Sequence, residues 1–150
     1  MGIPDELYRV FDYSSESQYD DEYGFLAGNT RIQLKMFRPW DEEEEKELID
    51  ALHSHLDWNN TRPSPFISVH SSKRAAYACA NGKINAGRRG VTIAFIDPYM
   101  LFEDQLRKVS KLADELEYEI PDAAYDNARC EWIVLHQIPN EAIMHLYCMN

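Results

Sequence analysis

The spacing of apolar and polar residues predicts a chain that combines short strands with amphipathic helices. Apolar runs of strand length occur at five places: Leu7–Phe11, Pro65–Val69, Val91–Ile96, Glu131–Ile138 and Ala142–Cys148. The predicted helices are Asp41–Leu56, an alanine-rich segment capped by Ser71 or Ser72, and Leu101–Leu116. Polar or glycine-containing stretches predict loops at Ser14–Tyr23, Asp57–Ser64, Gly82–Gly90 and Ile120–Arg129. This order predicts an α+β fold in which strands dominate the C-terminal half.

The helix predicted over Asp41–Leu56 has the clearest pattern. Asp41 can cap its N-terminus, and the acidic run Glu42–Glu45 suits the positive end of the helix dipole. Leu48 and Leu52 then fall on one face at helical spacing. We therefore interpret the acidic run as a solvated first turn.

Composition and charge narrow the classes of partner. The chain has 150 residues, so we expect a single domain over residues 1–150, with a core that needs neither disulfides nor metals. Its net charge of −11 disfavours binding to nucleic acid or to anionic membranes, and we expect neither. One small anion can still bind at a local arginine cluster, since distant charges are screened beyond about 10 Å.

Cysteines, histidines and apolar runs bear on metals and on the cellular compartment. The cysteines number three and lack CxxC spacing, which is typical of a reduced protein. No HExxH motif occurs, so no metal is expected. The sequence also lacks an apolar run of about 20 residues and a signal peptide at its N-terminus. We expect a protein that is cytoplasmic or delivered to a host cytosol.

Three polar residues stand where a plain apolar core would not place them. Arg9 lies within an apolar strand and must pair with an anion, either in a structural salt bridge or in a bound diphosphate. Ser68 ends a strand just before a helix, either as a cap or strand-edge residue or as part of a site. Glu131 opens an otherwise apolar strand, either exposed at its edge or as part of a site.

The segments around these residues resemble, in order, motifs of the ADP-ribosyltransferase family, in particular pertussis- and cholera-type toxin subunits. Leu7–Arg9 is similar to the arginine motif of the first strand, and Gly24–Asn29 to the loop that follows it. Phe66–Ser68 with Ser71–Arg74 resembles the Ser-Thr-Ser strand and its helix. Glu131–Ile143 resembles the strand of the catalytic glutamate and the Ile-Pro turn after it.

The resemblance implies a split β-sandwich with flanking helices and NAD as substrate. It implies that Glu131 stabilises the positive charge that develops on ribose when nicotinamide leaves, and that Arg9 binds the diphosphate. Ser68 would brace Glu131 or the ribose. His55 matches a His-Leu pair in pertussis-type members and would contact ribose or activate an acceptor, although a histidine at a helix C-terminus is also favoured by the dipole.

Several positions depart from the family pattern. His70 and Val69 replace two hydroxyl residues, and Asp12 is shifted by one residue from the family's acidic position; we expect Asp12 and His70 at the NAD site. Arg129 stands where arginine-modifying members have a second glutamate, and we expect it on the same strand face as Glu131.

Acceptor choice and overall function follow from these departures. A cation at position 129 cannot act as a base, so we expect an acceptor other than arginine, or water. Tyr125, like Phe25, is a candidate to stack on nicotinamide or on the protein acceptor. The sequence predicts an NAD-dependent ADP-ribosyltransferase or NAD glycohydrolase. The alternatives are a catalytically silent module of the same fold that binds a nucleotide or a protein, and an unrelated acidic α+β interaction protein.

Overall fold

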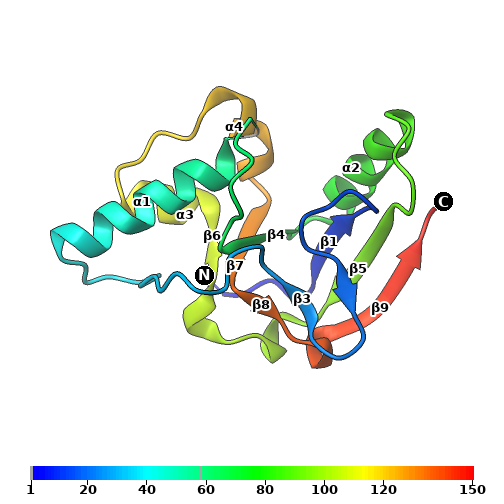
Figure 1. Cartoon of the computed structure of the whole chain (residues 1–150), viewed down its shortest axis with the longest axis horizontal. Helices are drawn as coiled ribbons and strands as arrows, with labels where there is room; N and C mark the ends of the chain where they lie inside the picture. Colours follow the sequence, from blue (N-terminus) through cyan, green and yellow to red (C-terminus); the bar gives the residue numbers. More distant parts are fainter. Residues whose placement is uncertain (1, 58) are drawn as a thin grey trace.

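A six-stranded sheet and a three-stranded sheet form the framework of the molecule (Figure 1). The computed structural model describes residues 2–57 and 59–150. Every strand pair in it is antiparallel. The large sheet has the order β6 (Leu106–Lys108), β7 (Glu131–Leu135), β4 (Phe66–His70), β1 (Leu7–Phe11), β5 (Thr92–Ile96), β9 (Ile143–Cys148). The small sheet has the order β2 (Tyr19–Asp20), β3 (Gly24–Leu26), β8 (Gln137–Ile138).

Each face of the large sheet buries its own apolar side chains. One face packs on the small sheet, where Phe25 and Ile138 meet Leu7, Ile67 and Val134. The other face is covered by helices, α1 (Glu42–Leu56), α2 (Lys73–Asn85), α3 (Val109–Glu115) and α4 (Asp122–Ala128). Three short 3₁₀ turns complete the described elements: Pro98–Met100, Glu103–Gln105 and Asn140–Ala142.

The helices cover this face in two separate groups. The first group, α1, α3 and α4, buries side chains such as Phe66 and Ile133 of β4 and β7. The second is α2 alone, which packs on Tyr8, Val10 and Ile93 of β1 and β5. Figure 1 shows the two groups at opposite ends of the sheet, with β4 and β1 between them. The middle of the sheet is therefore not covered by an apolar helix face.

The large sheet also splits at its centre. β4 pairs with β7 over five positions, and β1 pairs with β5 over five. Between β1 and β4, however, only the Tyr8–His70 pair is in register among the described residues. In place of a continuous ladder, Nη1 of Arg9 donates a hydrogen bond to the carbonyl oxygen of Ser68 at 3.2 Å. The gap leaves polar backbone and side chains accessible in the middle of the sheet.

The predicted α+β class is confirmed, and most element positions agree with the sequence pattern. The helix α1 begins with Asp41 as N-cap, in a reciprocal capping box with Glu44. Four of the five predicted strands are present, with a shift of at most one residue at either end. The fifth, predicted over Glu131–Ile138, is broken at His136, whose φ of 68° is in the left-handed region.

Four loop or helix predictions were wrong. The segment predicted as one helix, Leu101–Leu116, contains a 3₁₀ turn, then β6, and only then α3, because β6 pairs with the outer edge of β7. The predicted loop Ile120–Arg129 contains α4. The predicted turn region Gly82–Gly90 begins within α2, and the predicted loop Ser14–Tyr23 contains β2.

Candidate active site

A cavity of about 560 Å³ opens where the middle of the large sheet is left uncovered. Its floor comes from β1, β4 and β7, and its walls from the end of α1, from α2 and from residues 15–17. The polar side chains that line it include Arg9, Ser15, Glu16, Ser17, His55, Ser68, His70, Cys79, Lys83 and Glu131. Five of the residues that the sequence singled out, Arg9, His55, Ser68, His70 and Glu131, therefore meet in one cavity.

Glu131 is a buried carboxylate at the start of β7. Its side chain is on the helix-covered face, because strand residues two apart share a face and Ile133 packs with the helices there. Oε2 accepts a hydrogen bond of 2.6 Å from Oγ of Ser68 and lies 3.8 Å from Nε2 of His55. Burial would raise the pKa of Glu131, but His55, Ser68 and His70 outweigh it and hold the pKa below its ordinary value of 4.5. The carboxylate is therefore ionised at neutral pH.

His55 is placed by the last turn of α1 and touches a serine on each side. Its Nε2 lies 2.7 Å from Oγ of Ser68, and its Nδ1 lies 2.6 Å from Oγ of Ser64. The imidazole ring also meets the ring of Phe66 edge-on, with 5.6 Å between their centroids. These contacts fix the orientation of the ring within the cavity wall.

Arg9 lies at the gap between β1 and β4. Besides its bond to Ser68, it donates from Nη2 to the carbonyl oxygen of Ser17 at 2.9 Å, and its guanidinium stacks 5.0 Å from the ring centroid of Phe25. Burial lowers the pKa of Arg9 to about 10, so it stays charged at neutral pH. Its Nε is buried with no hydrogen-bond partner among the described residues. A buried cationic donor without a partner is suited to an anionic ligand.

His70 and Lys83 extend the polar surface away from Glu131. Burial lowers the pKa of His70, and the nearby charges of Arg9 and Lys83 lower it further against the opposing effect of Glu131. His70 is thus a neutral imidazole at physiological pH. Lys83 projects from α2 with about a third of its side chain exposed. The cavity is therefore lined by two carboxylates, Glu131 and Glu16, and by two cations, Arg9 and Lys83.

Asp12, which the sequence placed at the NAD site, does not line this cavity. Its carboxylate is buried and accepts hydrogen bonds from the backbone N and Oγ of Ser14 and from Nζ of Lys83. The structure thus gives Asp12 a position behind Lys83, where it neutralises and orients that lysine from α2.

Arg129 and Tyr125 also lie outside the cavity. Arg129 is exposed in the turn before β7. The expectation that it shares a strand face with Glu131 was therefore wrong. Both residues line a different hollow, beside α3 and α4, together with Tyr118. The reason is that β7 starts at Glu131, so the alternation of a strand does not extend back to position 129.

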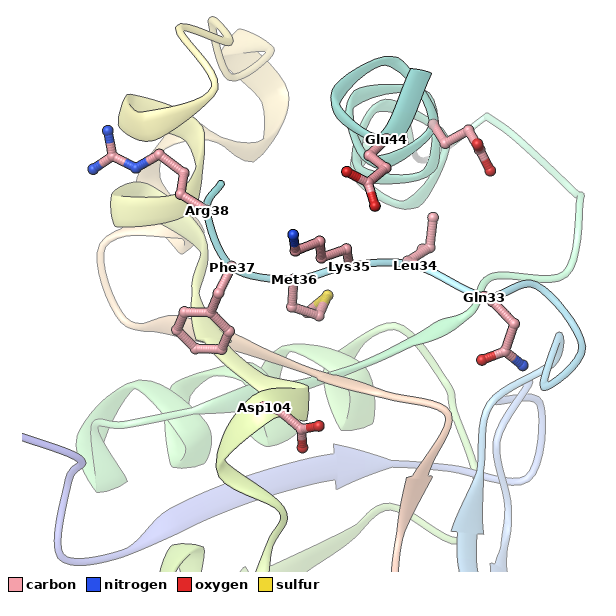
Figure 2. A pocket seen from close by; sticks show the side chains of 9 residues that line it. Gln33, Leu34, Lys35, Met36, Phe37, Arg38, Glu44 and Asp104 are labelled. Carbon is pink, nitrogen blue, oxygen red and sulfur yellow. The ribbon is translucent and has the colours of Figure 1, made fainter. Parts of the chain in front are cut away.

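A larger hollow, of about 660 Å³, lies away from these residues. Figure 2 shows the extended segment from Gln33 to Arg38 running between α1, with Glu44, and the segment that bears Asp104. The charged side chains of Lys35, Arg38 and Asp104 are exposed there. Because perturbed, buried ionisable groups mark functional sites better than cavity size does, the cavity around Glu131 is the candidate active site.

Sequence reasoning missed three residues of this site: Glu16, Ser64 and Lys83. Glu16 accepts a hydrogen bond from the backbone N of Ser64 at 3.1 Å, although 48 residues separate the two. Ser64 lies between two prolines in a predicted loop, and only that Pro-Ser-Pro run hinted at a rigid position. Lys83 lay in a region predicted as a turn, and its placement on α2 had no local signal.

Within residues 2–57 and 59–150, no group of three or more histidine, cysteine or acidic side chains is arranged to hold a metal ion. No helix in this described part has both the length and the apolarity needed to cross a bilayer.

Comparison with solved structures defines the class of fold. EcPltA, an ADP-ribosyltransferase toxin of the pertussis-like kind, superposes with a TM-score of 0.60 over 95% of this chain and 74% of its own, at 15% sequence identity. The chain thus has an ADP-ribosyltransferase-like fold, the split β-sandwich with flanking helices that the sequence predicted. A family described as "Domain of unknown function (DUF7587)" matches residues 2–149, and the chain belongs to this family. A search of curated proteins gave no match.

Proposed function

We propose that this chain is an NAD-dependent ADP-ribosyltransferase of the pertussis-like kind, or an NAD glycohydrolase, in which Glu131 promotes cleavage of the nicotinamide–ribose bond. One observation carries the proposal. A buried, ionised carboxylate is held by a 2.6 Å hydrogen bond from Ser68 in a cavity that also contains the buried guanidinium of Arg9. The likeness of the fold to an ADP-ribosyltransferase supports it.

Cleavage of the nicotinamide–ribose bond is favoured by a carboxylate next to the ribose. As the bond between C1′ of the ribose and the nicotinamide nitrogen breaks, its electron pair goes to the ring nitrogen and positive charge develops on the ribose. A fixed negative charge in a site of low dielectric stabilises that charge strongly. A nucleophile then bonds to C1′ and loses its proton, which gives an ADP-ribosylated acceptor or, with water, free ADP-ribose. Glu131 is the group that meets the developing charge.

Binding of the diphosphate is assigned to Arg9 and, in addition, to Lys83. Nε of Arg9 is buried without a partner among the described residues, which suits an oxygen of a bound anion. Lys83 lines the same cavity and is held by Asp12 at 3.3 Å. His70, neutral in the folded protein, is assigned to the ribose or nicotinamide side, where it replaces a hydroxyl of the family pattern.

The acceptor in this proposal is a protein side chain other than arginine, or water. Guanidinium has a pKa above about 12 and must lose a proton to react, which requires a dedicated base. The acidic residues lining the cavity within the described chain are Glu16 and Glu131, and Glu16 is already bonded to the backbone of Ser64. Tyr125 and Arg129, on the neighbouring hollow, are candidate contacts for the acceptor protein.

A silent module of the same fold remains the second candidate, and one observation favours it. Two nitrogens of the Arg9 guanidinium already donate to Ser68 and Ser17, and its face stacks on Phe25. An arginine with these contacts has a structural role even without a ligand. On this alternative the cavity binds a nucleotide or another small anion, and no bond is broken.

The deciding experiment compares nicotinamide release by the wild type with that by Glu131→Gln. The substitution keeps the volume of the side chain and its hydrogen bonding but removes the charge, and we expect release to fall by about 10²–10³. Glu43→Gln, an exposed glutamate on α1, is the matched control and should retain full activity. Calorimetric titration with NAD separates the candidates: binding without release identifies the silent module, and no binding contradicts the enzyme and any silent module that binds NAD.

A further inference from the structure

The hydrogen bonds around His55 fix where its proton lies. An ionised carboxylate can only accept, so the hydroxyl proton of Ser68 points to Oε2 of Glu131. Ser68 has no second proton, and its contact of 2.7 Å with His55 must therefore be a bond in which Nε2 of the imidazole donates. In the neutral ring the proton is thus on Nε2, and the lone pair is on Nδ1.

On the other side of the ring, Ser64 can donate a hydrogen bond to Nδ1 of His55. Oγ of Ser64 already accepts a hydrogen bond of 3.0 Å from the backbone N of Phe66. Its own proton is then free to point at Nδ1 of His55, which is 2.6 Å away. The hydrogen bonds therefore run one way, from the backbone of β4 through Ser64, His55 and Ser68 to Glu131.

Ser64 is itself held rigidly. It lies between Pro63 and Pro65, and a residue before proline is restricted to extended conformations. Its backbone N donates to Glu16, and its carbonyl oxygen accepts from the backbone N of Asn29 at 3.0 Å. A hydroxyl that is fixed on both sides of its backbone can select one tautomer of a neighbouring imidazole.

We propose that Ser64 is a positioning residue that holds His55 in its Nε2–H tautomer, so that His55 acts on Glu131 as a hydrogen-bond donor through Ser68 and not as a base. The inference deepens the proposed function and, in its consequence for catalysis, rests on it. With its lone pair aimed at Ser64, His55 offers no proton acceptor to the cavity.

The consequence concerns the nucleophile. Because His55 cannot take its proton, that proton must go to Glu131 or to water. No hydrogen bond engages Oε1 of Glu131 among the described residues, so this oxygen can accept. The site therefore suits nucleophiles for which Glu131 is a sufficient proton acceptor.

The tautomer is measured directly by nitrogen-15 NMR of imidazole-labelled wild-type protein at about pH 8, above the ordinary titration range of histidine. The signal of His55 is assigned by its loss in His55→Gln. We expect the Nε2–H form to predominate. An Nδ1–H form, or equal populations, would overturn the proposal whether or not the protein cleaves NAD.

The role of Ser64 is tested with Ser64→Ala and Ser64→Thr in the same measurement. Loss of one hydrogen bond should lower the ratio of Nε2–H to Nδ1–H by up to about tenfold in the alanine variant, and threonine should restore it. An unchanged ratio in a folded Ser64→Ala protein would show that Ser64 does not select the tautomer.

A second pair of variants, at position 55, tests whether His55 acts in catalysis as a hydrogen-bond donor, and this test does not require a change at Ser64. Glutamine at position 55 places an amide N–H near the place of Nε2, whereas asparagine places it near Nδ1. We expect His55→Gln to release nicotinamide within about tenfold of the wild type, the worth of one neutral hydrogen bond, and His55→Asn to release much less. Equal, severe loss in both variants would identify His55 as a base and overturn the proposal. If the wild type releases no nicotinamide, the proposed function fails, while the NMR result still decides the tautomer.

Discussion

Glu131 is buried and yet keeps a depressed pKa because its hydrogen-bond partners outweigh the cost of removing the charge from water. The carboxylate is thus charged over the whole neutral range, which an electrostatic role at ribose requires. His55 lowers this pKa most and Ser68 next. The hydroxyl of Ser68 donates to the carboxylate, and Nε2 of His55 lies 2.7 Å from Oγ of Ser68.

The contribution of Glu131 to the pH dependence of the proposed NAD cleavage follows from that pKa. Since the folded-state pKa of Glu131 lies below 4.5, activity should stay level as the pH is lowered from neutrality and should fall only below 4.5, as the carboxylate takes up a proton. The measurement is nicotinamide release against pH, with circular dichroism to confirm that the protein stays folded. An acid limb centred above 4.5 in folded protein would contradict this assignment.

Arg9 has a structural role and a proposed binding role. The free energy of unfolding measures the first, and the affinity for NAD measures the second. Arg9→Ala removes a buried cation that bridges β1 to Ser68 and Ser17, and should lower the free energy of unfolding by about 3 kcal/mol. Urea denaturation checks this value, with the exposed Arg31→Ala as a control that should change it by less than about 0.5 kcal/mol. In the fraction that stays folded, affinity for NAD should fall by at least about tenfold; an unchanged affinity would leave Arg9 with the structural role alone.

The residues that the sequence could identify are those that break a local rule. Arg9 within an apolar strand and Glu131 at the head of another are conspicuous without any structure, and both line the cavity. Arg129 was misplaced because its expected orientation depended on where β7 begins. Ser64 and Lys83 obey local rules, one in a proline-rich loop and one on a helix, so only the tertiary arrangement reveals them.

At the scale of elements, tertiary pairing overrides the local pattern in several places. Leu106, Val109 and Leu112 have the spacing of one helix, yet Leu106 belongs to β6, which pairs with the edge of β7 at Val134. The break at His136 likewise could not be read from an apolar run. It lets the chain leave the large sheet and enter the small one, where the carbonyl oxygen of His136 accepts from the backbone N of Ala27 at 2.8 Å.

Gly24 makes a close backbone contact in the small sheet, next to the point where the chain enters it from the large sheet. Its φ is 75°, and a Cβ there would collide with the carbonyl oxygen of Ile138 on the neighbouring strand. We expect Gly24→Ala to lower the free energy of unfolding by at least about 2 kcal/mol, since strain and the collision both act on the folded state. Gly82→Ala is the matched control: it lies in α2 with open space around it and should stabilise the protein by up to about 1 kcal/mol. Thermal denaturation of both variants tests the contrast, which fails if the two shift in the same direction.

At the scale of the molecule, the two helix groups belong to different halves of the split sheet, and Asp12 helps to fasten the α2 half. Its carboxylate at the end of β1 holds Lys83 of α2 at 3.3 Å, and Arg88 lies 3.9 Å away. Burial raises the pKa of Asp12, but hydrogen bonds from Ser14 and the charge of Lys83 bring it below its ordinary value of 3.8.

A depressed pKa means that Asp12 contributes stability above its unfolded-state pKa and that the contribution is lost as the pH falls through the folded-state value. Asp12→Asn should therefore lower the free energy of unfolding by about 2 kcal/mol at neutral pH, with the difference from the wild type shrinking at pH values below 3.8. Asp50→Asn, an exposed aspartate of α1, is the control and should show almost no difference at either pH. A difference for Asp12→Asn that stays constant down to acid pH would mean that the charge is not what stabilises the fold.

The order of strands in the large sheet also has a consequence for the chain as it is synthesised. Without β7, β4 is joined to the rest of the sheet, among the described residues, by one position in register with β1 and by the hydrogen bond from Arg9 to Ser68. A nascent or truncated chain that stops before Glu131 thus has an open, apolar strand edge, and such edges recruit other chains. The same stretch that closes this edge carries the carboxylate. A shortened product is therefore prone to aggregate and also lacks the carboxylate on which the proposed activity depends, so that this activity can arise only after translation has passed through β7.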